Sequence, residues 1–489
     1  KHPGNATSDV VQDNANGILQ LGSNSAVNNG HIIMGSGVQS GAAMSVSGGG
    51  DAVTRNNGVI DVNGRGTGLA VVDSGSGGQV GNAGLINLNG DNGTGLLVTA
   101  NEGALAHAWS SGPINIPGNA NVTTGTRNTA VWVKGIDSGV ASADITGPIT
   151  LNGAGAIGIR AEGNATVNVS QAAIPMGNSG ADQITFLAMG PNAKILLPEN
   201  GHYGVTGDNA SIFRVQDGAS FDGTGMTLTS NGNLSTAVLG SGDNATISTG
   251  NAIFNLGENG IGLRIEGAAQ GTIDAATTIN MNGTHSIAAQ VQGNRTDLNG
   301  LITNSTRLPY TNTLLTNNAD IHGSQDRQVG FIASSQGQLI NNGDITLEGN
   351  NTTGIASLGG NATNNGSVSI TNGSSGLYAE GYTYSVGARA TNNGTINVTA
   401  GNASAAQPSV GGVAFGDAGY FYQNGTINLY GENAVGAQAG NGGTVVIGEG
   451  SQIAFHAANQ IGYQALEGLS SIRNSSNLTT DAENISLFS

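Results

Sequence analysis

The chain contains no cysteine, few basic residues and few aromatic residues. Its 489 residues include 14 Lys and Arg against 31 Asp and Glu, which gives a net charge of −17, and aromatic residues make up 4%. The lack of cysteine excludes a disulfide framework and thiolate metal sites. A nucleic-acid binder needs a basic surface to displace counterions, so the charge balance argues against that class.

The chain also lacks a long apolar segment. A run of about 18 apolar residues, the usual minimum for a transmembrane helix, does not occur. The sequence begins at Lys1 without an apolar leader, so it is typical of a mature segment whose targeting signal has been removed. A large chain without disulfides suits export through an oxidising periplasm, because no bridge can lock it before it crosses the outer membrane. We therefore expect a secreted protein or one displayed on the bacterial cell surface.

The chain is rich in glycine and repeats itself. Gly accounts for 83 residues and apolar residues for 37%. A recurring unit consists of Asn-Gly followed by alternating apolar and polar residues. Because Asn and Gly tolerate positive φ, each copy predicts a corner that leads into a short strand. Copies begin at Asn29, Asn57, Asn342, Asn365, Asn393 and Asn424.

A second apolar strand, introduced by glycine as in Gly66-Thr67-Gly68-Leu69, follows the first unit, and a looser third unit returns the chain to the next corner. One such repeat cannot bury its apolar side alone, whereas stacked repeats close a continuous interior. The sequence therefore predicts an all-β fold: a right-handed, single-stranded parallel β-helix with three strands per coil, forming one domain over residues 1–489. In-register stacking also predicts ladders of Asn over Asn at the corners.

Three stretches exceed the basic repeat, near residues 99–125, 293–328 and 381–410. Insertions in a solenoid form loops, and loops are where binding residues concentrate. Arg and Tyr cluster in the second and third stretches, and Arg with Tyr is a common recognition pairing. An equally open reading is that each Tyr simply covers the adjacent coil. The candidates for glycan binding are Arg295, Arg307, Tyr310, Arg327, Tyr382 and Arg389.

The second strand of each repeat carries another candidate surface. Alignment on its glycine places Trp132, Arg160, Arg264, Gln290 and Tyr378 in one column, with Lys134, Glu162, Glu266, Gln292 and Glu380 two residues later. Strand alternation directs both columns outward as adjacent ribbons. They form either a track for an extended protein ligand or a set of surface ion pairs worth less than about 1 kcal/mol each.

No pattern of catalytic residues stands out. Asp73-Ser74-Gly75-Ser76 resembles the nucleophile segment of chymotrypsin-like proteases only weakly, because no separate segment supplies His and Asp. Polysaccharide lyases and hydrolases use parallel β-helices with clustered acids, but no spacing brings Asp217 and Asp222, or Asp326, to catalytic distance. The seven histidines show no metal spacing. We expect no enzyme, no metal and no cofactor.

The recurrent Asn-Asn-Gly-x-Ile-x-Val and Gly-x-Gly-Leu units, with no Cys and scarce Lys, resemble the passenger domain of a type V autotransporter, over about residues 15 to 475. The resemblance implies a signal peptide and a C-terminal membrane β-barrel, both outside this segment. Among passengers of the adhesin type it implies binding of fibronectin-type matrix glycoproteins and glycosaminoglycans. Two other functions stay open: self-association between bacteria, which leads to aggregation and biofilm formation, and polysaccharide cleavage.

Overall fold

A computed structural model describes residues 7–10, 15–22, 24–48, 53–304, 308–399 and 407–489 of the chain. Within these ranges the fold is almost entirely β, and the helical elements are two short 3-10 turns, η1 (Val122–Thr124) and η2 (Gln171–Ala173). The chain divides into two compact units: unit 1 comprises residues 1–220 and 297–301, and unit 2 comprises residues 221–296 and 302–489. One domain over residues 1–489 stays a prediction.

Unit 1 consists of three parallel sheets, which we name A, B1 and C. Sheet A contains β1 (Thr7–Val10), β4 (His31–Met34), β7 (Val59–Val62), β10 (Leu85–Leu88), β13 (Ile114–Ile116) and β16 (Ile149–Leu151). Sheet B1 contains β2 (Ala15–Leu21), β5 (Gly41–Ser47), β8 (Thr67–Val72), β11 (Thr94–Ala100), β14 (Thr129–Gly135), β17 (Ile157–Gly163), β19 (Ile184–Met189) and β22 (Ser211–Gln216). Sheet C contains β3 (Ala26–Asn28), β6 (Thr54–Asn56), β9 (Val80–Asn82), β12 (Leu105–Ser110), β15 (Val140–Ile145), β18 (Ala165–Val169) and β20 (Lys194–Leu196). Strand β21 (His202–Val205) comes next in the chain and is not part of sheet C.

Unit 2 has the same plan, with sheets that we name B2, D and E. Sheet B2 contains β25 (Thr236–Ser241), β28 (Ile261–Glu266), β31 (Ile287–Gln292), β34 (Val329–Ser334), β37 (Thr353–Leu358), β40 (Ser375–Glu380), β43 (Val410–Phe415), β46 (Val435–Gly440), β49 (Ile461–Ala465) and β51 (Ser486–Phe488). Sheet D contains β24 (Thr227–Ser230), β27 (Ile253–Leu256), β30 (Thr278–Met281), β33 (Ile321–Gly323), β36 (Ile345–Leu347), β39 (Ser367–Ile370), β42 (Thr395–Val398), β45 (Thr426–Leu429) and β48 (Gln452–Phe455). Sheet E contains β23 (Ser220–Asp222), β26 (Thr246–Ser248), β29 (Gln270–Ile273), β32 (Leu314–Asn317), β35 (Gln338–Asn341), β38 (Asn361–Asn364), β41 (Ala388–Asn392), β44 (Gly419–Gln423), β47 (Thr444–Ile447) and β50 (Ser471–Asn474).

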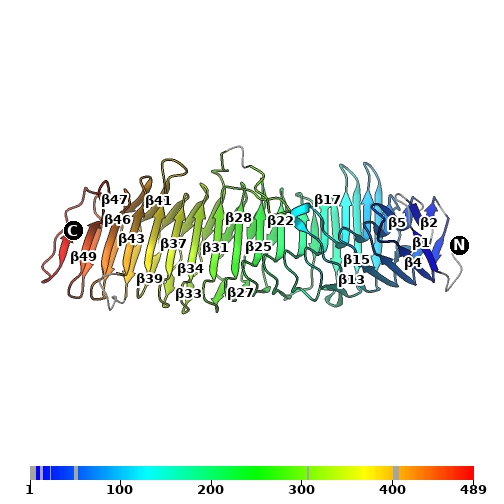
Figure 1. Ribbon diagram of the computed structural model, residues 1–489, viewed down its shortest axis with the longest axis horizontal. Helices are drawn as coiled ribbons and strands as arrows, with labels where there is room; N and C mark the ends of the chain where they lie inside the picture. The colour runs from blue at the N-terminus through cyan, green and yellow to red at the C-terminus, as the bar shows by residue number, and fades with distance from the viewer. Residues whose placement is uncertain (1–6, 11–14, 23, 49–52, 305–307, 400–406) are drawn as a thin grey trace. The chain divides into compact units, whose positions relative to one another are not determined.

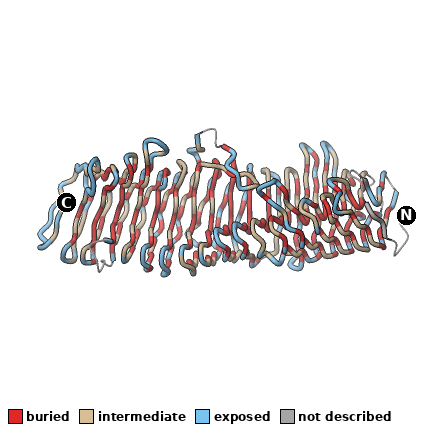
Figure 2. The backbone as a smooth tube through the Cα atoms, viewed as in Figure 1, coloured by how far each residue is buried: buried red, intermediate tan, exposed pale blue. Residues whose placement is uncertain are grey.

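Within each unit the chain visits its three sheets once per coil, and each strand pairs in parallel with the equivalent strand of the next coil (Figure 1). In sheet D, for example, Ile396 of β42 pairs with Val368 of β39 and with Ile427 of β45. All three side chains are fully buried, so apolar residues stack along a narrow interior. Figure 2 shows the buried segments recurring along successive strands, with exposed residues at the turns. An all-β parallel β-helix with three strands per coil is confirmed.

The predicted asparagine ladders are present at the corners that follow sheets C and E. In unit 2 a buried ladder runs from Asn317 to Asn341, Asn364 and Asn392, with side-chain hydrogen bonds of 2.7, 2.8 and 2.9 Å between consecutive members. Each amide also binds a carbonyl of its own corner, as Asn341 Nδ2 binds Gly343 O at 2.8 Å. These bonds satisfy polar groups that the stacked coils bury.

These corners require glycine for a different reason from the positive φ that the sequence suggests. Gly343, Gly366 and Gly394 do not have positive φ. Instead, a Cβ on Gly394 would lie 1.9 Å from the carbonyl oxygen of Gly366 in the adjacent coil. Close approach of stacked backbones therefore requires glycine there, and the prediction of positive φ at these corners is wrong.

The three long stretches were expected to form loops, but parts of them form strands. Residues 99–125 include β12, β13 and η1, so the irregular part begins after β13. In the second stretch a long loop lies between β31 and β32, and its described residues are 293–304 and 308–313. In the third, residues 381–387 form a loop before β41, and residues 400–406, after β42, lie outside the described residues.

Residues 297–301 belong to unit 1, although they are distant in sequence from its other residues. The Arg127 guanidinium donates hydrogen bonds to the carbonyl oxygens of Gly155 at 3.0 Å, Asp182 at 2.7 Å and Leu298 at 2.6 Å. Leu298 also packs against an apolar cluster of Ile157, Ile184 and Leu187. Burial of the guanidinium, with Arg214 nearby, lowers the pKa of Arg127 to about 10.

Candidate functional site

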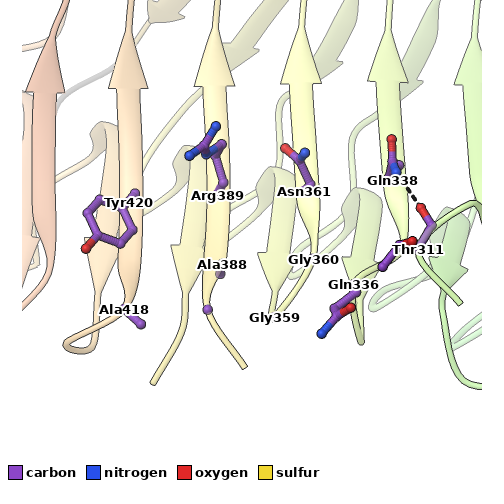
Figure 3. Close-up of a pocket in the computed structure, with 11 residues that line it drawn as sticks. Thr311, Gln336, Gln338, Gly359, Gly360, Asn361, Ala388, Arg389, Ala418 and Tyr420 are labelled. Carbon is purple, nitrogen blue, oxygen red and sulfur yellow. Dashed lines mark hydrogen bonds between the residues drawn. The ribbon is translucent and has the colours of Figure 1, made fainter. Parts of the chain in front are cut away.

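Sheet E of unit 2 has an outward row of polar and aromatic side chains. Gln338, Asn361, Arg389 and Tyr420 pair in register on β35, β38, β41 and β44. Their strand neighbours Leu339, Ala362, Ala390 and Phe421 are buried, so alternation turns the row outward. Tyr422 lies two residues after Tyr420 on the same side of the strand. We name Gln338, Asn361, Arg389, Tyr420 and Tyr422 the E face, and Figure 3 shows its first four members on neighbouring strands.

Arg389 is the centre of the E face. Its guanidinium carbon lies 4.7 Å from the centroid of the Tyr422 ring, and its Nη2 is 3.4 Å from the Tyr422 hydroxyl oxygen. The rings of Tyr420 and Tyr422 stack with centroids 6.2 Å apart. The side chain of Arg389 is exposed and forms no salt bridge with a described carboxylate. Its charge is therefore held in place by an aromatic ring and stays available to a ligand.

A cavity of about 410 Å³ lies along this row. Gln336, Gln338, Asn361, Arg389 and Tyr420 line it, together with the backbone of Gly359 and Gly360 (Figure 3). At one end the Gln338 side-chain amide donates a hydrogen bond to the carbonyl oxygen of Thr311, so the loop between β31 and β32 closes that end. Amides, a guanidinium and a tyrosine ring converge on a concave surface, which is typical of a site for a polar ligand.

The predicted ribbon is present in sheet B1, where Trp132 pairs with Arg160 and Lys134 pairs with Glu162. The guanidinium carbon of Arg160 lies 3.9 Å from the centroid of the Trp132 ring. The Glu162 carboxylate accepts hydrogen bonds from Arg160 and from Trp132 Nε1, both at 3.1 Å, and Lys134 Nζ lies 3.8 Å from it. Desolvation of the guanidinium lowers the pKa of Arg160, whereas Glu162 opposes that shift. Glu162 therefore meets the charges of this cluster, although Arg160 Nε is buried with no hydrogen-bond partner among the described residues.

In sheet B2 the predicted columns keep their register, but Glu266 is not open to solvent. Arg264 pairs with Gln290 and Glu266 pairs with Gln292. Glu266 is 0% exposed, because the loop after β31 folds over it and Thr296 donates to its carboxylate from both N–H and hydroxyl, at 2.9 and 2.6 Å. Ser241 and Gln292 donate at 3.0 Å, and Arg264 Nη2 lies 3.3 Å away. Glu266 therefore anchors a loop.

Further along sheet B2, Tyr378 and Glu380 lie on β40. The Tyr378 hydroxyl donates to Glu380 Oε2 at 2.8 Å, and the Tyr382 hydroxyl donates to Oε1 at 3.1 Å. Burial, strengthened by the neighbouring carboxylate, raises the pKa of Tyr378, so its hydroxyl stays a donor. Tyr382 also stacks on Tyr384, with ring centroids 5.2 Å apart.

The six glycan-binding candidates do not form one site. Arg389 lies on the E face, and Tyr382 lies beside Glu380 in the loop before β41. Arg295 lies at the start of the loop between β31 and β32, and Tyr310 lies near its end, next to Thr311 of the cavity. Arg327 is exposed in the turn between sheets D and B2. Arg307 lies outside the described residues.

One trio of residues combines the groups of a hydrolytic triad. His107 Nδ1 lies 2.7 Å from Ser142 Oγ, and His107 Nε2 lies 3.2 Å from Asp144 Oδ2. Strand β15, which carries Ser142 and Asp144, pairs on both sides with β12 and β18, so its backbone N–H groups are used by the sheet. A pair of N–H groups aimed at a developing oxyanion is needed for acyl transfer, and the paired strand offers none at Ser142.

Other reactive groups have structural partners. Asp326 Oδ1 accepts hydrogen bonds from the backbone and side chain of Asn350 at 2.9 and 3.1 Å. Ser74 is buried and binds the backbone of His107. Within the described ranges, no three His, Asp or Glu residues are grouped so as to hold a metal ion. The helical turns described here are also too short to cross a bilayer.

Tyr420 and Tyr422 were not predicted as site residues. Their signal is Gly419-Tyr420-Phe421-Tyr422, in which two tyrosines flank a buried phenylalanine in a chain poor in aromatics. Alternation alone places both tyrosines on the same outward side. Insertions around β41 hide their alignment with Arg389.

Comparison with protein-family models, with curated proteins and with solved structures finds no match for this chain.

Proposed function

We propose that this chain is a bacterial surface adhesin of the autotransporter passenger type, which binds extracellular-matrix components and holds a glycan on the E face. One observation carries the proposal: two amides, an exposed guanidinium and a tyrosine follow one another in register along a cavity of about 410 Å³, and a second tyrosine lies against the guanidinium. Buried residues on the other side of the same strands make this surface rigid.

Each part of the E face suits a different part of a sugar chain. The planar fork of Arg389 matches a carboxylate or sulfate group. The amides of Asn361 and Gln338 both donate and accept, as a sugar hydroxyl requires. Tyr420 offers an apolar ring with a polar tip. Coils in parallel sheets repeat at about 4.8 Å, so a polymer extended along the row meets a new side chain at each coil.

Retention on immobilised heparin and on neutral dextran tests the proposal. We expect Arg389→Ala to lose at least tenfold in heparin affinity, and Tyr420→Ala to lose affinity for both glycans. Arg473→Ala is the matched control. Arg473 is exposed on β50 of the same sheet, and its substitution removes the same charge. Equal retention of Arg389→Ala and Arg473→Ala at physiological salt would rule out a specific site on the E face.

Self-association is the second candidate, and a surface feature favours it. Beside the buried ladder, Asn342, Asn365, Asn393 and Asn424 form a second, exposed ladder with hydrogen bonds of 3.0, 3.2 and 3.1 Å. Such a row presents amides to a second copy of the chain. Analytical ultracentrifugation distinguishes the two functions, since concentration-dependent dimers that Asn365→Asp and Asn393→Asp abolish would favour association.

Release of unsaturated or reducing ends from acidic polysaccharides would instead favour an enzyme.

A further inference from the structure

Three glutamates of the second-strand column occupy equivalent positions, and they differ in their counter-ions. Glu162 has Arg160 and Lys134, and Glu266 has Arg264. At Glu380 the residue two positions earlier is Tyr378 in place of arginine, and no Lys or Arg among the described residues pairs with the carboxylate. The same position therefore has an internal cation twice and lacks one at the third site.

The Glu380 carboxylate retains room for a donor. Each of its oxygens accepts one tyrosine hydroxyl, from Tyr378 and from Tyr382. A carboxylate offers about four acceptor positions, so roughly two stay free. The two hydroxyls also fix the carboxylate in one orientation, so a ligand need not order it.

A cavity of about 320 Å³ opens at this carboxylate. Leu358, Val386 and the Tyr382 ring form its apolar wall, and Ser335 and Ser385 lie at its edge. Leu358 pairs with Glu380 across neighbouring strands and is 41% exposed. Apolar walls that lead to a single fixed carboxylate match a flexible hydrocarbon stem that ends in an ammonium group.

We propose that this cavity binds a lysine side chain of a partner protein, with Glu380 as counter-ion and the Tyr382 ring against the stem. A lysine fits better than an amino sugar because the wall is apolar and a sugar ring carries hydroxyls. The chain's net charge of −17 attracts basic partners over a longer range. This site is separate from the proposed glycan site, although Gly359 borders both cavities.

The test uses the peptide acetyl-Gly-Lys-Gly-amide and its norleucine analogue, which has the same stem without the charge. Saturation-transfer NMR on the whole chain gives the affinities. We expect the lysine peptide to bind at least tenfold more tightly than the analogue, and Glu380→Gln to remove that preference. Glu449→Gln is the control, because Glu449 is an exposed acid elsewhere in unit 2.

A second variant keeps the proposal testable if Glu380→Gln disturbs the tyrosines. Leu358→Lys introduces an ammonium group opposite an intact Glu380, at a position that is 41% exposed. The new lysine side chain should itself pair with Glu380 in the cavity and lower the affinity for the lysine peptide at least tenfold. Equal binding of both peptides, binding that Leu358→Lys leaves unchanged, or binding of glucosamine in preference to lysine would each overturn the proposal. Arg389→Ala should not affect this binding, which separates the result from that of the glycan site.

Discussion

Two regions of the molecule place an arginine on an aromatic ring, and they differ in what else the arginine contacts. In sheet B1, the guanidinium carbon of Arg160 lies 3.9 Å from the centroid of the Trp132 ring. The Arg160 side chain is 15% exposed, and its charge is met by Glu162. On the E face, Arg389 lies 4.7 Å from the Tyr422 ring, is exposed and has no described carboxylate beside it. The first arrangement is closed, whereas the second leaves a charge for a ligand.

The difference shows that an arginine next to an aromatic residue is not by itself a binding site. Both pairs gain from the attraction between a cation and a ring. What separates them is the counter-ion and the cavity: Glu162 meets the charge of Arg160, whereas Arg389 has no described carboxylate beside it and lines an open cavity. The following substitutions test this comparison, beginning with the most closed cluster.

Glu266→Ala should have the largest effect, because Glu266 is the most completely enclosed carboxylate of the column. Its removal takes away the one carboxylate that Arg264, Gln292, Ser241 and Thr296 share. Breaking such a buried pair costs about 3–5 kcal/mol. Urea unfolding measures the loss, and hydrogen exchange should increase in the loop between β31 and β32. A loss no greater than that of Glu449→Ala would contradict the anchoring role.

Arg160→Ala should destabilise the chain by about 1–3 kcal/mol, because Glu162 loses a charged donor and the Trp132 ring loses the guanidinium that lies over it. Heparin retention should not change. Chemical unfolding and the heparin column together check both parts. Reduced retention with unchanged stability would mean that the closed cluster is itself a binding surface.

Arg389→Lys should show a smaller and purely functional effect. Lysine keeps the charge and loses the planar fork and its stacking on Tyr422. We expect heparin affinity to fall about fivefold, which is about 1 kcal/mol, with unfolding unchanged. If the lysine variant binds as well as wild type, Arg389 acts as a point charge and the E face does not orient the ligand.

The fold could be predicted because its causes are local and repeated. Asn-Asn-Gly corners and alternating strands fix the register, so the pairs Trp132–Arg160 and Lys134–Glu162 follow from aligned glycines alone. The corner glycine was predicted for the wrong reason, since the close approach of two backbones is a property of stacked coils and has no trace in one copy.

The candidate site was harder to predict because it depends on loops. Burial of Glu266 results from a loop that folds back over the strand, and a strand pattern does not contain that loop's path. Likewise, Arg389 was assigned to an insertion although it lies on β41, between Asn361 and Tyr420. Variable loop lengths between β38 and β44 prevented the alignment that would have revealed the row.

The smallest effect is expected at an exposed ion pair in unit 1, where Arg65 Nε and Nη2 each donate to Asp91 at 2.9 Å. These hydrogen bonds lower the pKa of Asp91 below its ordinary value of 3.8. A lowered folded-state pKa stabilises the fold above the unfolded value and loses that contribution as pH falls through the folded value. Both side chains are more than a third exposed, so solvent screening keeps this contribution to stability small. Unfolding of Asp91→Asn should therefore differ slightly from wild type at neutral pH and converge with it in acid below the ordinary value, whereas Asp243→Asn, at an exposed acid without a described partner, should show no such convergence. A difference that persists in acid would mean that packing, and not charge, holds this pair.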